Sequence, residues 1–116
     1  MINYDMHIHT AYCGHAPTMT INAIIKAAEE KQMETIAITS HVFTEADLAL
    51  IPQIRNEIAK IKTDVKVIIG AEVDADGMRT DGKLVTDKFD RLDYVLGTLH
   101  WIPTTGVYPR YQKTIR

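Results

Sequence analysis

The chain has 116 residues, of which 46% are apolar and 24% are charged, a composition typical of one globular domain with a small core. The formal net charge of −2, from 13 basic and 15 acidic residues, argues against a nucleic-acid backbone as the main partner. The single cysteine, Cys13, cannot form an internal disulfide and fits a reducing compartment. Because the sequence shows no secretory signal and no apolar stretch long enough for a bilayer, we expect a cytoplasmic protein without a membrane partner.

The first half of the chain alternates between strand and helix patterns, as α/β folds do. Residues 2–9 alternate apolar and polar side chains and predict a strand whose polar face carries the histidines. After a loop that contains Gly14 and Pro17, residues 20–32 place apolar side chains at helical spacing and predict an amphipathic helix. The β-branched run at residues 35–40 predicts a buried strand.

The second half continues the same alternation. A helix is predicted to begin near Pro52, a residue that suits a first helical turn. Residues 65–73 predict a third strand, and residues 74–85, with two glycines, are compatible with a β-hairpin excursion. A short helix is predicted over 86–91 and a fourth strand over 93–99. Since four strands cannot close a barrel, the fold is either an open sheet or part of a larger barrel.

Side chains that commonly bind metals stand at the carboxyl end of every predicted strand. His9 ends the first strand, His41 follows the second, Glu72 ends the third and His100 follows the fourth. In parallel α/β folds the carboxyl ends of the strands meet at the edge that carries the active site. We therefore expect these four side chains to converge.

Each candidate in the first motif also has an ordinary structural interpretation. His7 and His9 leave the same face of a strand and suit one shared cation, but a pair of partly buried, hydrogen-bonded histidines fits as well. Asp5 is predicted on that face, either to orient an imidazole or to accept a hydrogen bond within the strand. A polar face of this kind is costly to bury without a charged partner, which favours a metal. His15 lies in a loop, where histidines are usually exposed to solvent.

The later candidates have ordinary interpretations too. His41 suits a turn or a helix N-cap, as its neighbour Ser40 does. Glu72 suits a solvated hairpin start, although a buried carboxylate there would need a partner. His100 could pack on Trp101. All five histidines at predicted rim positions together favour a metal centre.

Four segments resemble the motifs of the polymerase and histidinol phosphatase (PHP) domain family, namely YDMHIHTAYCGHA, ITSH, GAEVD and GTLHW. Their order and spacing agree over nearly the whole chain, which looks most similar to the stand-alone phosphoesterase or histidinol-phosphatase branch. The resemblance implies a distorted seven-stranded (β/α) TIM-like barrel. Residues 1–116 would form the N-terminal portion of that domain, with about four of its parallel strands.

The resemblance also implies two or three divalent metal ions at the carboxyl rim. The HxH pair would bind one ion, and Glu72 would bridge it to a second ion held by His100, while His15 and His41 would hold a third. Mixed histidine and carboxylate ligands suit Zn²⁺, Mn²⁺ or Fe²⁺. The implied metal ligands are His7, His9, His15, His41, Glu72 and His100.

These features predict a phosphoesterase that hydrolyses a small phosphomonoester with a metal-activated hydroxide. Candidate phosphate partners, chosen by position, are Arg79, Lys83 and Arg110. Later family ligands have no counterpart, because no histidine follows His100 and no aspartate follows Asp93. The alternatives are a nuclease of this family or an inactive metal-binding fragment. Open barrel edges also predict a homo-oligomer.

Overall fold

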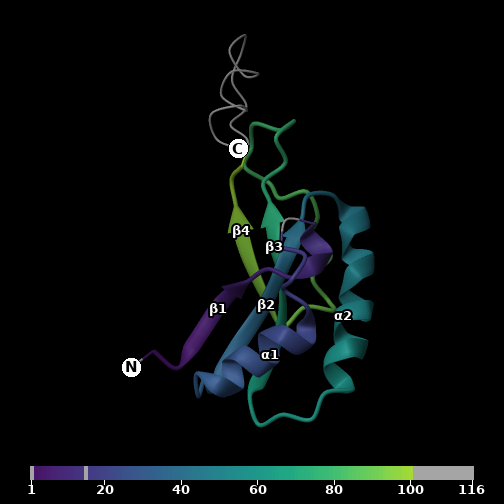
Figure 1. The fold of residues 1–116 in the computed structure, drawn as a ribbon. Helices are drawn as coiled ribbons and strands as arrows, with labels where there is room; N and C mark the ends of the chain where they lie inside the picture. The colour runs from purple at the N-terminus through teal and green to yellow at the C-terminus, as the bar shows by residue number, and fades with distance from the viewer. Residues whose placement is uncertain (1, 15, 101–116) are drawn as a thin grey trace.

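The computed structural model describes residues 2–14 and 16–100, which form a parallel sheet covered by helices (Figure 1). The sheet has four strands in the order β1-β2-β3-β4, and every neighbouring pair is parallel. The strands curl into a half-barrel, so the predicted partial TIM-like α/β barrel is confirmed. The strands are β1 (Tyr4–Ile8), β2 (Thr35–Val42), β3 (Lys66–Asp74) and β4 (Tyr94–Thr98). The helical elements are η1 (Ala11–Cys13), α1 (Ile21–Glu30), η2 (Glu45–Ala49) and α2 (Leu50–Ala59).

Helix α1 begins where a threonine caps it. Thr20 accepts a hydrogen bond from the backbone N–H of Ala23 at 3.2 Å, which satisfies one of the donors that the first helical turn leaves unpaired. The apolar spacing predicted over residues 20–32 then turns one face of the helix toward the sheet. The buried residues of that face are Ile21, Ile24, Ile25 and Ala28.

The main core lies between the sheet and the two α-helices, which cover the same side of it (Figure 1). Ile36 and Ile38 of β2 are fully buried there and contact the apolar face of α1, together with Ile54 of α2. This arrangement follows from right-handed crossovers between parallel strands, which place successive helices on one side. Side chains of β2 alternate, so His41 lies on the face opposite the helices, where the candidate site forms.

Gly70 lets β3 and β4 approach closely, and a Cβ atom there would lie 2.5 Å from the backbone oxygen of Tyr94. We expect Gly70→Ala to lower the free energy of unfolding by about 1–3 kcal/mol, because the backbone must shift to relieve the overlap. The measurement is the midpoint of urea unfolding. Gly97→Ala is the matched control, since its Cβ would meet only Leu84 at 3.7 Å, an ordinary contact. Equal midpoints for the two variants would contradict the prediction.

The predicted short helix over residues 86–91 is wrong, because this segment is not helical. Two contacts with η2 hold it instead. The Thr86 hydroxyl donates to Glu45 at 3.0 Å, and the Lys88 ammonium lies 2.7 Å from the same carboxylate and lowers its pKa. Phe89 and Leu92 pack against a second core cluster at Val42, Ala71 and Val73. These tertiary contacts outweigh the local helical preference.

The possible hairpin after β3 is present in minimal form. Ala75 and Leu84 make a single antiparallel bridge, and the Asp76 N–H donates to the Lys83 oxygen at 2.8 Å. The returning chain thus pairs beside the end of β3 and leads into the segment before β4. Within the described ranges, neither α-helix is long and apolar enough to cross a membrane.

Candidate metal centre

Side chains at or just beyond the carboxyl ends of all four strands meet at one edge of the sheet, on the face that the helices do not cover. They form two adjacent groups, and within each group the potential ligand atoms lie within 4.8 Å of one another. The convergence predicted from strand ends is therefore present for the candidates that the structure describes. The first group is His7, His9 and Glu72, and the second is His41, Asp74 and His100.

The first group has the spacing of ligands around one cation. The Nε2 atoms of His7 and His9 lie 3.1 Å apart, and the two oxygens of Glu72 lie 2.9 Å from His7 and 3.4 Å from His9. Ligand atoms bound at about 2.0–2.2 Å stand about 3.3–3.6 Å apart in a tetrahedral site and about 2.8–3.1 Å apart when adjacent in an octahedral one. The donor set and its separations therefore fit a divalent transition-metal ion.

Glu72 links the two groups. Its Oε2 lies 2.6 Å from Nδ1 of His41, while Nδ1 of His100 lies 2.7 Å from Asp74 Oδ1. The rings of His9 and His41 are 4.2 Å apart, and Phe43 stacks on His41 at 4.5 Å. One carboxylate in contact with three imidazoles is suited to bridging two ions.

Burial supports the same interpretation. The side chains of Glu72 and His41 are 7% and 8% exposed, whereas that of His7 is 52% exposed. The cluster is therefore shielded from solvent at β2 and β3 and exposed to solvent at β1. Within the described residues, the buried Oε2 of Glu72 accepts no hydrogen bond although two imidazoles lie close to it. A buried carboxylate oxygen is costly unless a hydrogen bond or a cation compensates it. A bound cation would supply that compensation.

The structure places Asp5 differently from the simple alternation of residues 2–9. A register shift between Asp5 and Ile8, a span that includes His7, interrupts the regular pairing of β1 with β2. The Asp5 carboxylate accepts the backbone N–H of His7 at 3.2 Å. Its expected role in orienting an imidazole stays a prediction. Ile2 and Tyr4, expected on the apolar face, are 81% and 56% exposed.

The remaining candidates lie elsewhere or outside the described part of the chain. Arg79 forms a two-point ion pair with Asp81, which raises the pKa of the guanidinium and holds the pKa of the carboxyl well below its usual range. Lys83 is exposed on the same loop. His15 and Arg110 lie outside the described residues. Four histidines and Glu72 are thus brought together, whereas no contact within the described part of the chain joins Arg79 to them.

Asp74 is a member of the second group that our reading of the sequence missed. The predicted strand ended at residue 73, whereas β3 extends to Asp74. The signal was present in the segment GAEVD, because residues two apart on a strand share a face, and Glu72 is two residues before Asp74. His41 also lies within β2 instead of after it, since the strand continues to Val42.

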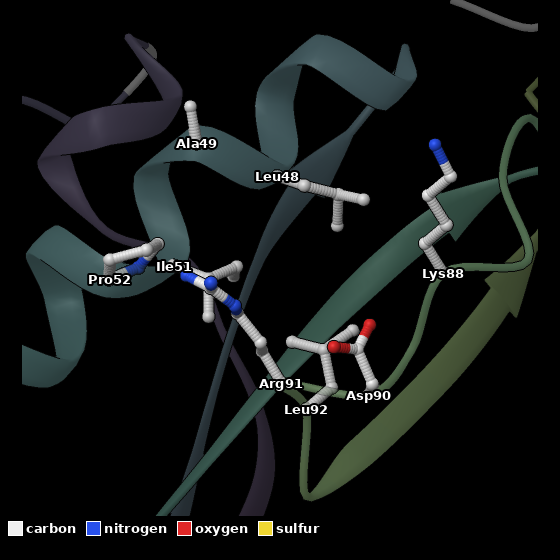
Figure 2. A pocket seen from close by; sticks show the side chains of 8 residues that line it. All are labelled: Leu48, Ala49, Ile51, Pro52, Lys88, Asp90, Arg91 and Leu92. Atoms are coloured by element: carbon white, nitrogen blue, oxygen red, sulfur yellow. The ribbon is translucent and has the colours of Figure 1, made fainter.

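Two concavities differ in their relation to these ligands. A hollow of about 400 Å³ opens beside the first group and is lined by Asp5, His7, Ile8, His9, Ala16 and Met19. A second cavity of about 260 Å³ lies between the start of α2 and the segment before β4, where Arg91 extends toward Ile51 and Pro52 (Figure 2). None of the ligand candidates that the structure describes lines the second cavity, whereas His7 and His9 line the hollow at β1, which is therefore the approach to the cluster.

Comparison with protein families adds an independent finding. The model of the PHP domain matches residues 5–115, which is nearly the whole chain. The chain belongs to the PHP domain family. PHP domains are generally metal-dependent hydrolases of the phosphoesterase type and typically bind divalent metals, in agreement with the ligand groups at the sheet edge. Comparison with curated proteins finds no match.

Proposed function

We propose that this PHP domain is a phosphoesterase that hydrolyses a small phosphomonoester, in the manner of histidinol phosphatases, with two or three Zn²⁺, Mn²⁺ or Fe²⁺ ions. The observation that carries the proposal is the contact of Glu72 with three imidazoles beside a second His–Asp–His group. In such a site divalent ions act as Lewis acids, which lower the pKa of water and neutralise phosphate oxygens.

The residues of the cluster would have different roles, because they differ in burial. Glu72 and His41, which are almost fully buried, would hold ions at the closed base of the site. His7, which is half exposed, lies beside the hollow through which a phosphate ester would enter. The volume of the hollow, about 400 Å³, lies in the range typical of small-molecule sites, which favours a small ester.

Charge explains why such a cluster needs cations before it can accept a phosphate. With neutral imidazoles, the two carboxylates give the six side chains a charge of −2, which repels an anion. Two divalent cations would change that charge to −2 + 4 = +2. Among residues 2–14 and 16–100, no lysine or arginine lines the hollow, and Arg79 is already paired with Asp81, so the ions would provide most of the attraction for phosphate.

The test is a comparison of two substrates with the metal-loaded chain. We expect inorganic phosphate to be released from an aryl phosphomonoester in the presence of Mn²⁺, with no cleavage of a single-stranded DNA oligonucleotide. The control is the same protein treated with EDTA, which should be inactive. Cleavage of DNA alone would support a nuclease instead, and bound metal without turnover of either substrate would support an inactive metal-binding fragment.

We also propose that the chain self-associates through its open sheet edges. In the described part of the chain, β1 and β4 each have one neighbouring strand, and Tyr4 and Leu99 near these edges are 56% and 57% exposed. Unpaired edges invite pairing with another copy. We expect light scattering after gel filtration to give a molar mass at least twice that of one chain. The Tyr4→Lys variant should have a lower molar mass in the same measurement.

The matched control for this edge is Met78→Lys, which places the same charge on a loop residue that is 90% exposed. It should leave the mass unchanged. A wild-type protein that has the mass of one chain at every concentration would contradict self-association.

A further inference from the structure

Asp74 is a buried carboxylate at the carboxyl end of β3, and its side chain is 2% exposed. Its Oδ1 lies 2.7 Å from Nδ1 of His100, a separation typical of a charge-assisted hydrogen bond. When Asp74 is ionised its oxygens only accept, and this hydrogen bond then places the imidazole proton on Nδ1. The lone pair of the His100 ring is then on Nε2, the atom that points away from Asp74.

The backbone on both sides of Asp74 is fixed. Asp74 pairs with Thr98 of β4, and the Ala75 N–H donates to the Thr98 oxygen at 2.7 Å. On the other side, the Val85 N–H donates to the Asp74 oxygen at 2.8 Å. The carboxylate is therefore held at a defined place relative to the end of β4, two residues before His100.

His100, by contrast, lies beyond the last residue of β4, and its side chain is 31% exposed. Apart from Asp74, the ring has aromatic neighbours at 5.4 Å (His41) and 5.9 Å (Phe43). These contacts limit where the ring can lie but do not select one of its two nitrogens. The hydrogen bond to Asp74 does select one.

We propose that Asp74 is a positioning residue, which holds His100 as the Nδ1–H tautomer and directs its Nε2 toward a metal ion; this inference rests on the proposed function. Histidines that bind metals commonly donate their other ring N–H to a carboxylate, which fixes the ring and raises its basicity. In this arrangement Oδ1 of Asp74 accepts the His100 N–H, and Asp74 acts on the ion through His100.

Two measurements on the full chain test this role. In the metal-free wild-type protein, ¹⁵N chemical shifts of the imidazoles should show His100 as the Nδ1–H tautomer, and Asp74→Asn should shift it toward Nε2–H. In competition with a fluorescent chelator, Asp74→Asn should bind Zn²⁺ about 10- to 100-fold more weakly, with the same number of ions per chain.

The matched control is Asp64→Asn, which removes the same charge from an exposed residue at the other end of β3. It should change neither the tautomer nor the Zn²⁺ affinity. Thermal unfolding of each metal-free variant shows whether the fold is retained, and the tautomer of the wild-type protein tests the role even if a variant unfolds.

Three results would overturn the assignment of Asp74. They are an Nε2–H tautomer of His100 in the wild-type protein, an unchanged Zn²⁺ affinity of Asp74→Asn, and the loss of a whole ion from that variant, which would make Asp74 a ligand. A wild-type chain that binds no divalent cation would instead overturn the proposed function, and with it the ligand role of His100.

Discussion

Glu72→Gln is expected to lower the affinity for divalent cations by more than about 100-fold, because even residues that only support metal ligands typically contribute 10- to 100-fold. Glu72 contacts His7, His9 and His41, so its replacement affects both ligand groups at once. Elemental analysis after dialysis against Zn²⁺ should show bound metal in the wild-type protein and almost none in the variant. Phosphomonoester hydrolysis should fall in parallel.

Stability measurements separate loss of metal from loss of fold. An ion at about 100 times its Kd should stabilise the wild-type protein by about 2.7 kcal/mol, and the variant should gain little. Without metal, Glu72→Gln should be at least as stable as the wild type, because it removes a buried charge from the protein interior. His9→Ala should have a smaller effect on metal content, since it removes a ligand from one group only. Wild-type metal content in Glu72→Gln would rule out its bridging role.

Ile38→Ala is expected to lower the free energy of unfolding by about 2–5 kcal/mol through loss of buried surface and the cavity that remains. Ile38 is fully buried in the cluster between β2 and α1. A chain of this length is typically stable by on the order of 10 kcal/mol, so the loss would be a large fraction of the total. Urea unfolding followed by circular dichroism measures it.

Ile58→Ala is the matched control, because Ile58 lies on α2 at the margin of the same cluster and is only partly buried. Its loss of stability should be clearly smaller. Ile38→Ala should leave metal stoichiometry unchanged under conditions in which it is folded, since Ile38 faces the helices and the ligands face the other way. Equal losses for the two variants would show that the core does not centre on β2.

Local sequence patterns predicted most of the fold. The apolar spacing of residues 20–32 corresponds to α1, and the β-branched and apolar runs correspond to β2 and β3. The predictions that failed lie where a tertiary contact opposes a local preference. Residues 86–91 do not form a helix, because Thr86 and Lys88 contact Glu45, a residue more than 40 positions earlier in the chain.

The candidate metal centre was predictable in part because the rule that links strand ends to one sheet edge needs no coordinates. That rule identified His9, His41, Glu72 and His100, which the structure brings together. It did not identify Asp74, because the predicted strand ended at residue 73, whereas β3 extends to Asp74 through its pairing with Thr98. Nor could it show how far β1 departs from strict alternation at Asp5, since a register shift is a property of two paired strands.

The amino-acid sequence alone therefore determined the order of strands and helices and the kinds of side chain available to bind a metal, because both depend on short-range periodicity and on residue chemistry. Only the tertiary structure decided which side chains lie close enough together to form a metal site. Grouping His41 with Asp74 and His100, and linking them through Glu72, depends on the register of β2, β3 and β4. Strand register is set by packing between distant segments, and a shift of one residue would turn these ligands to the other face.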